Sequence, residues 1–402
     1  MRCFQEIKNE KFNDEEFSTV TSEEQIKVEK SVEKLFDTFV LRTCVDKELP
    51  KLLRWEHANF LKNSIVYLPS SYACLDASRA WLCYWILHSL NLLDVALPST
   101  LQSQIVQFLA KCQNPEGGFS GGPGQSSHLA PTYAAVNTLC IIGTQEAYDA
   151  INRDALQRFL WALRSPEGAF SMHVDGEVDI RGVYCALAVA TLTNIYTPEL
   201  FKDTADWVLG CQTYEGGFSG CPGMEAHGGY AFCGLASLTM LQKADLCNKQ
   251  ALLRWTVNRQ MKFEGGFQGR TNKLVDGCYS FWQGGAFPLL HELLLSTGDS
   301  VNPTCLLFHQ EALQEYILIC CQNASGGLID KPGKPRDIYH TCYALSGLSV
   351  AQQSVGGVRN VVGASTNELE PTHPVYNISP ALAIRAMRHY RQLPVPRIEQ
   401  TS

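Results

Sequence analysis

Five segments of this chain carry the same short pattern, in which a glycine pair follows a short polar run. The first glycine of each pair serves as an anchor, and the second unit has Ala169 in place of its second glycine. The anchors stand 51, 48, 49 and 61 residues apart, at Gly117, Gly168, Gly216, Gly265 and Gly326. A period near fifty residues predicts a repeat architecture, in which each unit is one supersecondary element.

Each unit is predicted to be a helical hairpin. Before the glycines, residues recur at i, i+3, i+4 and i+7, the spacing of an amphipathic helix. The first and third units show this spacing at Ile105, Phe108, Leu109 and Cys112, and at Ala205, Val208, Leu209 and Gln212. After the glycines comes a segment that is apolar almost all round, such as TYAAVNTLCIIG, and such a helix is buried on all sides. Each unit is therefore an outer helix, a glycine loop and an inner helix.

Two further segments resemble inner helices, Asp76 to Leu93 and roughly His373 to Arg388. With the five units they predict an all-α protein, an α/α barrel (toroid) of about six helical hairpins with glycine-rich loops. An open α-solenoid is the structural alternative, but it needs polar capping repeats that the sequence does not clearly show. The expected parts are an N-terminal arm (1–50) with a short helix near Glu23 to Phe36, the barrel (51–396) and a tail (397–402).

Composition excludes several classes of protein. A hydrophobic fraction of 45% allows a large core, and a formal net charge of -7 argues against nucleic acid as the main partner. The 16 cysteines show no C-x-x-C spacing and mostly stand in apolar runs, which indicates buried, reduced thiols. We find no secretory signal and no apolar run long enough to span a membrane. We therefore expect a cytoplasmic protein.

A candidate metal site emerges when positions are counted from the anchors. Eleven residues after each anchor stands an ionisable residue, and in the fourth unit this is Asp276, with Cys278 two residues later. In the fifth unit, His340 stands fourteen residues after the anchor. These positions begin neighbouring inner helices, so a closed barrel brings them to one end of its cavity. A carboxylate, a thiolate and an imidazole form a three-ligand zinc set with an open fourth position, typical of catalytic sites.

Two reservations accompany this prediction. An Asp-x-Cys pair is common by chance, because free cysteine is among the most buried residue types. A lone histidine at a helix start is usually a hydrogen-bonded core residue. The shared spacing favours zinc, with Asp337 as a partner that orients one ligand.

The same end of the barrel is basic, although the protein is acidic. His227, Arg270, Lys273 and Tyr279 offer four donors beside the metal, which suits a diphosphate. The alternative is a solvated basic loop. The inner helices also supply aromatic residues, interleaved with glycines that leave room for a ligand. A cationic mouth above an apolar funnel suits a lipid diphosphate, and the alternative is an ordinary helical core.

Several long motifs resemble the β subunits of protein prenyltransferases. They are VDGCYSFW, EAHGGY, FQGRTNKL, KPGKPRDIYHTCY, CLDASRAWLCYWILHSL and HLAPTYAAVNTLCIIGT, and the last two resemble the farnesyl-transferring members. The resemblance covers the chain from about Thr19 to about Pro396. It implies a catalytic β subunit that forms a heterodimer with a helical-repeat α subunit. It also implies farnesyl transfer from farnesyl diphosphate to the cysteine of C-terminal CaaX sequences, through a zinc-bound thiolate.

The resemblance also implies a role for each matching residue. The zinc ligands are Asp276, Cys278 and His340, and Asp330 matches a residue implicated in magnesium binding. The diphosphate contacts are His227, Arg270, Lys273 and Tyr279, the last also assigned to catalysis. The isoprenoid contacts are Trp81, Arg181, Tyr184, Tyr230, Cys233, Trp282 and Tyr343. The peptide contacts are Ser78, Trp81, Trp85, His128, Ala130, Pro131 and Tyr339.

Three rival functions remain open from the sequence. A type I geranylgeranyltransferase takes a longer isoprenoid, but the bulk of Trp81 and Tyr343 favours the shorter one. A non-catalytic helical-repeat binding module would have structural zinc or none. A terpene cyclase of similar architecture is a weaker rival, because the sequence lacks a D-x-D-D acid motif.

Overall fold

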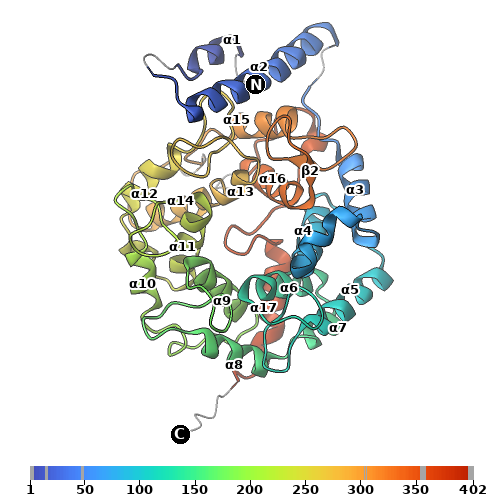
Figure 1. Ribbon diagram of the computed structural model, residues 1–402, viewed down its shortest axis with the longest axis vertical. Helices are drawn as coiled ribbons and strands as arrows, with labels where there is room; N and C mark the ends of the chain where they lie inside the picture. The colour runs from blue at the N-terminus through green and yellow to red at the C-terminus, as the bar shows by residue number, and fades with distance from the viewer. Residues whose placement is uncertain are drawn as a thin grey trace.

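Six inner helical positions pack side by side into a closed ring, which confirms the predicted barrel (Figure 1). The computed structural model describes residues 4–13, 17–46, 49–302, 304, 306–353 and 359–396. Contacts run around the ring in chain order, and the last inner helix closes it by packing against the first. The inner helices are α4 (Arg79–Leu92), α6 (Leu129–Ile142), α9 (Ile180–Leu192), α11 (Gly228–Met240), α13 (Tyr279–Trp282) continued by α14 (Ala286–Ser296), and α16 (Ile338–Ala351).

An outer layer of amphipathic helices surrounds this ring. In the first unit, Ile105, Leu109 and Cys112 are buried as predicted, while Phe108 is half-buried beneath the Arg79 guanidinium. The outer elements are α3 (Arg54–Val66), α5 (Ser99–Cys112), α8 (Arg153–Leu163), α10 (Thr204–Gly210), α12 (Lys249–Val257), and α15 (Gln310–Glu315) continued by a π-helix, η4 (Tyr316–Cys320).

Short elements complete the described fold. They are α7 (Gln145–Asp149), the 3-10 helices η1 (Lys8–Glu10), η2 (Ser70–Ser78), η3 (Ala244–Leu246) and η5 (Ser365–Asn367), and the antiparallel strands β1 (Leu328–Ile329) and β2 (Arg336–Asp337).

The predicted extent of the third outer helix was too long. Helix α10 ends at Gly210, and Gln212 instead forms an isolated antiparallel bridge to Phe218.

The anchor glycines are required both by backbone angle and by space. All five have positive φ, from 86° at Gly326 to 111° at Gly216, in the region that L side chains rarely adopt. A Cβ at Gly117 would lie 1.9 Å from the carbonyl oxygen of Ala155 in the next outer helix, α8. A Cβ at Gly326 would lie 2.0 Å from the carbonyl oxygen of Glu56 in α3, so the last unit closes the outer layer against the first.

A repeated backbone hydrogen bond joins each unit to the next. The N–H twelve positions after an anchor donates to the carbonyl four positions after the following anchor. The four bonds between anchored units are Leu129 to Met172, Ile180 to Gly220, Gly228 to Gly269 and Gly277 to Asp330, at 2.7 to 2.9 Å. The first residue of α4, Arg79, makes the matching bond to Gly121 at 2.8 Å. These bonds place the start of each inner helix beside the loop of its neighbour.

The C-terminal segment differs from its prediction. The helix there is α17 (Pro380–Arg391), which packs against α6 and α9 and takes no place in the ring. Its buried residues are Ala383, Ala386 and Tyr390, so it is apolar on one face only and suits a surface position. The prediction of an inner helix was wrong because it considered how many apolar residues the segment has and not on which faces they lie.

The chain between α16 and α17 crosses the interior of the ring (Figure 1). Three tyrosine hydroxyls from successive inner helices donate to three consecutive carbonyls of this segment. They join Tyr84 to Asn377 at 2.7 Å, Tyr133 to Tyr376 at 2.9 Å and Tyr184 to Val375 at 2.7 Å. We call residues 372–378 the plug, because this segment is held inside the ring by bonds to three inner helices.

The N-terminal arm contains α1 (Phe4–Ile7) and α2 (Val20–Asp46). Helix α2 runs ten residues beyond the predicted end at Phe36, because residues 37–46 contain no glycine or proline to stop it. The arm packs on the fourth unit, where Gln25 donates to Glu264 at 2.8 Å and the rings of Phe36 and Phe263 meet edge to face. The predicted tail, 397–402, lies outside the described residues.

Candidate active site

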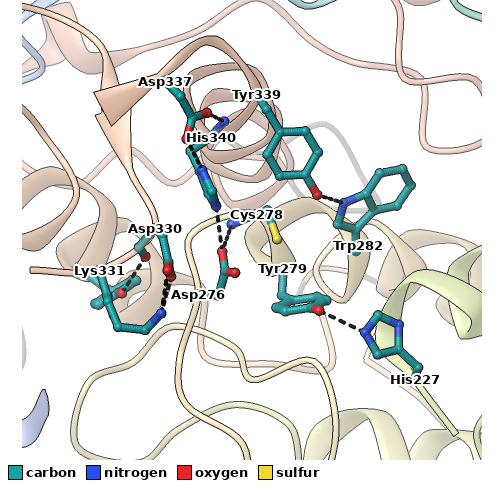
Figure 2. A network of polar contacts seen from close by, with 11 residues as sticks. His227, Asp276, Cys278, Tyr279, Trp282, Asp330, Lys331, Asp337, Tyr339 and His340 are labelled. Atoms are coloured by element: carbon teal, nitrogen blue, oxygen red, sulfur yellow. Dashed lines mark hydrogen bonds and ion pairs between the residues drawn. The ribbon is translucent and has the colours of Figure 1, made fainter. Parts of the chain in front are cut away.

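Asp276, Cys278 and His340 converge at one end of the barrel, as predicted (Figure 2). Their candidate ligand atoms all lie within 4.8 Å of one another, and His340 Nε2 is 3.3 Å from an Asp276 oxygen. The convergence follows from the junction bond described above. Gly277, between the first two residues, donates to Asp330 in the loop that leads to His340.

The ionisable residues at the starts of the inner helices have a structural reason. His128, Asp179, His227 and Asp337 are the N-caps of α6, α9, α11 and α16, and each side chain accepts a backbone N–H of its own helix. Asp276 does the same for Cys278 N–H at 2.8 Å. The helix that follows is broken, because α13 ends at Trp282 and Gly284 and Gly285 precede α14. The residue eleven positions after an anchor thus caps an inner helix in four units. In the remaining unit this residue is Asp276, a candidate metal ligand.

Second partners orient the candidate ligands. His340 Nδ1 lies 2.6 Å from Asp337, which fixes the imidazole with Nε2 toward Asp276. Burial lowers the pKa of His340, but hydrogen bonds to Asp276 and Asp337 outweigh it and raise the pKa to about 10. Burial and the charge of Asp276 raise the pKa of the Cys278 thiol well above its usual value. Burial opposes ionisation of Asp276, yet the hydrogen bond and charge of His340 lower its pKa.

These donors fit a zinc ion. The set combines sulfur, nitrogen and oxygen in the three-ligand pattern of catalytic zinc sites. Cys278 is only 4% exposed, and the imidazole already has the carboxylate partner that metal-bound histidines usually have.

Asp330 lies beside this triad, but it is already paired. Its carboxylate forms an ion pair with Lys331 (Figure 2). Lys331 is only 8% exposed. Burial and the charge of Asp276 raise the pKa of Asp330. Its position at the triad makes it a candidate magnesium ligand, provided that Lys331 moves.

His227 and Tyr279 form the predicted polar rim next to the triad. The Tyr279 hydroxyl lies 2.8 Å from His227 Nε2, while His227 Nδ1 accepts the Gly229 N–H. Burial and then the charge of Arg270 lower the pKa of His227, so the ring is neutral and carries its proton on Nε2. That proton is donated to Tyr279, whose own hydrogen is then free to donate to a ligand.

The other two predicted rim residues differ in placement. Arg270 pairs with Glu225 and lowers the pKa of His227 through its charge, so it lies close to the rim. Lys273 is exposed and lines a groove beside Phe17 and Thr19 of the arm. The role of Lys273 beside the His227–Tyr279 pair stays a prediction.

Below the rim, eight aromatic side chains form a continuous ring around the barrel interior. We call this ring the aromatic belt, and every inner helix position contributes to it. Centroids of successive members lie 4.5 to 5.6 Å apart, in the order Trp81, Trp85, Tyr339, Tyr343, Trp282, Phe232, Tyr184 and Tyr133. The predicted isoprenoid residues Trp81, Tyr184, Trp282 and Tyr343 belong to it.

The remaining predicted contacts lie around the belt. Cys233 is buried on α11, and Arg181, paired with Asp179, lies 5.9 Å from the Tyr230 ring centre. Ser78 is the N-cap residue of α4, three positions before Trp81. Of the other predicted peptide residues, Trp85 and Tyr339 pack against each other, and His128, Ala130 and Pro131 begin α6.

The sequence prediction missed two belt members and the plug. Tyr133 and Phe232 stand sixteen positions after their anchors, the same position as Tyr184, so the counting that found the metal ligands would have found them. The plug gave no such signal, because its contacts use backbone carbonyls, which every residue carries.

Comparisons with known proteins decide the family. The model for the prenyltransferase alpha-alpha toroid domain matches residues 52–378. A relative from Pisum sativum, described as protein farnesyltransferase subunit beta, is 44% identical over 75% of this chain and 86% of its own length. One from Arabidopsis thaliana with the same description is 40% identical over 90% of this chain and 87% of its own length. The chain belongs to the protein farnesyltransferase β-subunit family.

The solved structure of a related enzyme shows the same fold. Candida albicans protein geranylgeranyltransferase-I, complexed with GGPP, matches with a TM-score of 0.71 and 22% identity, over 85% of this chain and 99% of that one. That structure thus shares the fold seen here. Within the described residues, none of the helices combines the length and apolar character needed to cross a bilayer.

Proposed function

We propose that this farnesyltransferase β-family chain is a catalytic subunit that transfers farnesyl from farnesyl diphosphate to the cysteine thiol of C-terminal CaaX sequences. The observation that carries the proposal is the Asp276–Cys278–His340 triad at the mouth of a barrel lined by the aromatic belt. This arrangement brings a three-donor candidate metal site and a wall of apolar aromatic rings together, because the rings of Tyr339 and His340 lie 5.0 Å apart. The first suits a thiol and the second suits an isoprenoid.

Zinc is the metal that this donor set favours. When bound there, zinc would lower the pKa of a substrate thiol, so that the thiolate is available near neutral pH. The chain supplies no nucleophile of its own. Carbon 1 of the isoprenoid forms a bond to sulfur as its bond to the diphosphate oxygen breaks, and the electron pair leaves with the diphosphate.

The polar rim acts on that leaving group. Because His227 donates to the Tyr279 hydroxyl, the phenol proton is directed toward a ligand oxygen. Burial raises the pKa of Tyr279, so the phenol stays a donor at neutral pH. Arg270 adds positive charge nearby once Glu225 releases it. Donors fixed before the reaction stabilise the growing charge on the leaving oxygen without reorganising.

The aromatic belt sets the size of the apolar substrate. Trp81 and Tyr343 lie on opposite sides of Trp85 and Tyr339 in the belt, and Tyr343 is fully buried. Their bulk limits the depth available to an isoprenoid and favours fifteen carbons over twenty. We assign the peptide to the side of the cavity formed by Trp85, Tyr339 and the start of α6.

We also propose a magnesium ion, an α subunit and a cytoplasmic location. Asp330 would hold the magnesium beside the diphosphate after exchanging its ion pair with Lys331. An α subunit would complete an obligate heterodimer, as in the family that the chain belongs to. Cysteines buried in the inner helices, such as Cys83, Cys140 and Cys185, are free thiols, which suits a reducing compartment.

The decisive experiment is isoprenoid transfer to a CaaX peptide by the zinc-loaded chain, purified with and without an α subunit. We expect transfer of farnesyl to the peptide thiol in the complex, none to a peptide with serine in place of cysteine, and much less transfer from geranylgeranyl diphosphate. A zinc-loaded complex that binds farnesyl diphosphate yet leaves the peptide unmodified would overturn the proposal. Faster transfer of geranylgeranyl would overturn the assigned substrate.

A further inference from the structure

The junction between the fourth and fifth units carries an additional hydrogen bond. At this junction the carbonyl of Asp330 accepts the N–H of Gly277 at 2.7 Å. The same carbonyl accepts the hydroxyl of Tyr316 at 3.1 Å. A carbonyl oxygen has two lone pairs, so both bonds can be satisfied together.

Tyr316 reaches this carbonyl from the outer layer of the barrel. It is fully buried and begins the π-helix η4, an element often found at functional sites. Its ring lies against Gly266, where a Cβ would approach the ring carbon within 2.5 Å. The corresponding positions, ten residues before the other anchors, hold Gln107, Arg158, Asp206 and Trp255. The phenol is therefore a feature of the fifth unit and not of the repeat.

The carbonyl that Tyr316 holds connects two parts of the site. Gly277 stands between the candidate ligands Asp276 and Cys278, and a Cβ at this glycine would lie 2.8 Å from the carbonyl oxygen of Ile329. The side chain of Asp330 lies beside the triad with Lys331. A single backbone carbonyl thus sets the distance between the two-ligand loop and the loop that carries Asp330.

We propose that Tyr316 is a positioning residue for the metal site, which fixes the Asp276–Cys278 loop against the fifth unit through the carbonyl of Asp330. The inference rests on the proposed function only in taking the triad as a metal site. Burial raises the pKa of Tyr316 far above its usual value, so the hydroxyl remains a donor throughout the physiological range. Tyr316 is not one of the candidate ligands and acts on them through the loop.

The test compares two single-oxygen deletions. Tyr316→Phe removes the hydroxyl and keeps the ring. Tyr390→Phe is the matched control, because the buried Tyr390 hydroxyl also donates to a backbone carbonyl, that of Tyr148, at 3.1 Å. Each variant is purified as full chain in complex with an α subunit. Zinc affinity is measured by competition with a chromogenic chelator, at a temperature where circular dichroism shows both variants to be folded.

We expect Tyr316→Phe to weaken zinc binding roughly tenfold, the lower end of the range for partners that orient metal ligands. Tyr390→Phe should bind zinc like the unsubstituted chain. With Co²⁺ in place of zinc, the visible absorption bands should change in Tyr316→Phe and not in the control. Amide hydrogen exchange at Gly277 should also become faster.

The outcomes separate this inference from the proposed function. If the unsubstituted complex binds no zinc, the metal site itself is wrong, and both proposals fall. If it binds zinc and Tyr316→Phe binds equally tightly with unchanged Co²⁺ bands, only the role of Tyr316 is overturned. If both variants weaken zinc binding to the same degree, the effect is one of general stability, which also overturns the positioning role.

Discussion

His340 donates from Nδ1 to the carboxylate of Asp337 across 2.6 Å, and this contact turns Nε2 toward Asp276. The same carboxylate caps α16 by accepting the backbone N–H of His340. One aspartate thus begins the helix and aims the imidazole on its first turn. In this unit the capping position of the repeat has become part of the candidate metal site.

Replacing Asp337 with asparagine should therefore weaken zinc binding by about 10- to 100-fold, because the amide keeps the cap but loses the charge that orients the ring. Asp179→Asn is the matched control, since Asp179 caps α9 in the same way without touching the triad. Isothermal titration against a zinc chelate buffer measures both. Equal zinc affinities in the two variants would contradict the role assigned to Asp337.

Removing a ligand should empty the site. We expect about one zinc per chain in the unsubstituted protein and a strong reduction in Cys278→Ala and in His340→Ala, because two donors hold zinc far more weakly than three. Cys140→Ala, which removes a fully buried thiol in α6, should keep its zinc. Elemental analysis of the purified chains gives the counts, and full occupancy in both ligand variants would rule out the triad.

Tyr279→Phe should lower the turnover of farnesyl transfer by about 100- to 1,000-fold, since it deletes a donor aimed at developing charge. Zinc content should stay unchanged, because Tyr279 is not a ligand. Single-turnover kinetics with saturating peptide isolates the chemical step. A variant that transfers farnesyl at the original rate would show that the His227–Tyr279 pair serves structure alone.

Trp81→Thr should admit a longer isoprenoid, because it removes a large ring from the aromatic belt. We expect the ratio of geranylgeranyl to farnesyl transfer to rise about tenfold or more, in line with the 1–3 kcal/mol that one or a few buried groups contribute to discrimination. Competition between the two diphosphates in one reaction measures this ratio. A variant that still uses only farnesyl diphosphate would show that the aromatic belt does not select the length of the isoprenoid.

Acid should destabilise the fold through histidines that are buried in neutral form. Burial lowers the pKa of His88 and of His373 to about 4, and both contact the plug segment or belong to it. In the unfolded chain the value is about 6.5. Between these pH values the unfolded state binds more protons, so the free energy of unfolding falls as pH drops from about 6.5 to about 4. Each histidine contributes a slope of about 1.4 kcal/mol per pH unit.

Denaturant unfolding at several pH values measures that slope. His88→Gln should reduce it by about one histidine's share. An unaltered slope in His88→Gln would show that this histidine does not titrate between the two states.

Sequence spacing predicted most of this site for a physical reason. The closed ring places equivalent positions of each unit at the same height, so counting from Gly265 and Gly326 was enough to pair Cys278 with His340. Spacing could not predict which side chains pair at the rim, where Arg270 pairs with Glu225 and Tyr279 contacts His227, because such contacts depend on side-chain rotamers. The broken helix after Trp282 also went unnoticed, although Gly284 and Gly285 mark it.

Other features lay beyond any reading of spacing. Tyr316 acts through a backbone carbonyl, and its reach depends on a π-helical turn that residue types alone do not announce. Helix α17 was mistaken for an inner helix because its alanines fit either position. Only packing decides whether such a segment closes the ring or lies across it.

Ring closure has a consequence for the order in which this chain can be completed on the ribosome. Helix α4 packs against α16 in the closed ring. The first residue of α16 is synthesised about 260 residues after the first residue of α4. At about 5–20 residues per second, the apolar side of α4 waits for roughly 10–50 s before its final neighbour exists. During that interval the ring is not closed, and the helices at its two ends expose apolar faces. Until the last unit emerges, the native contacts with α16 cannot cover that face of α4.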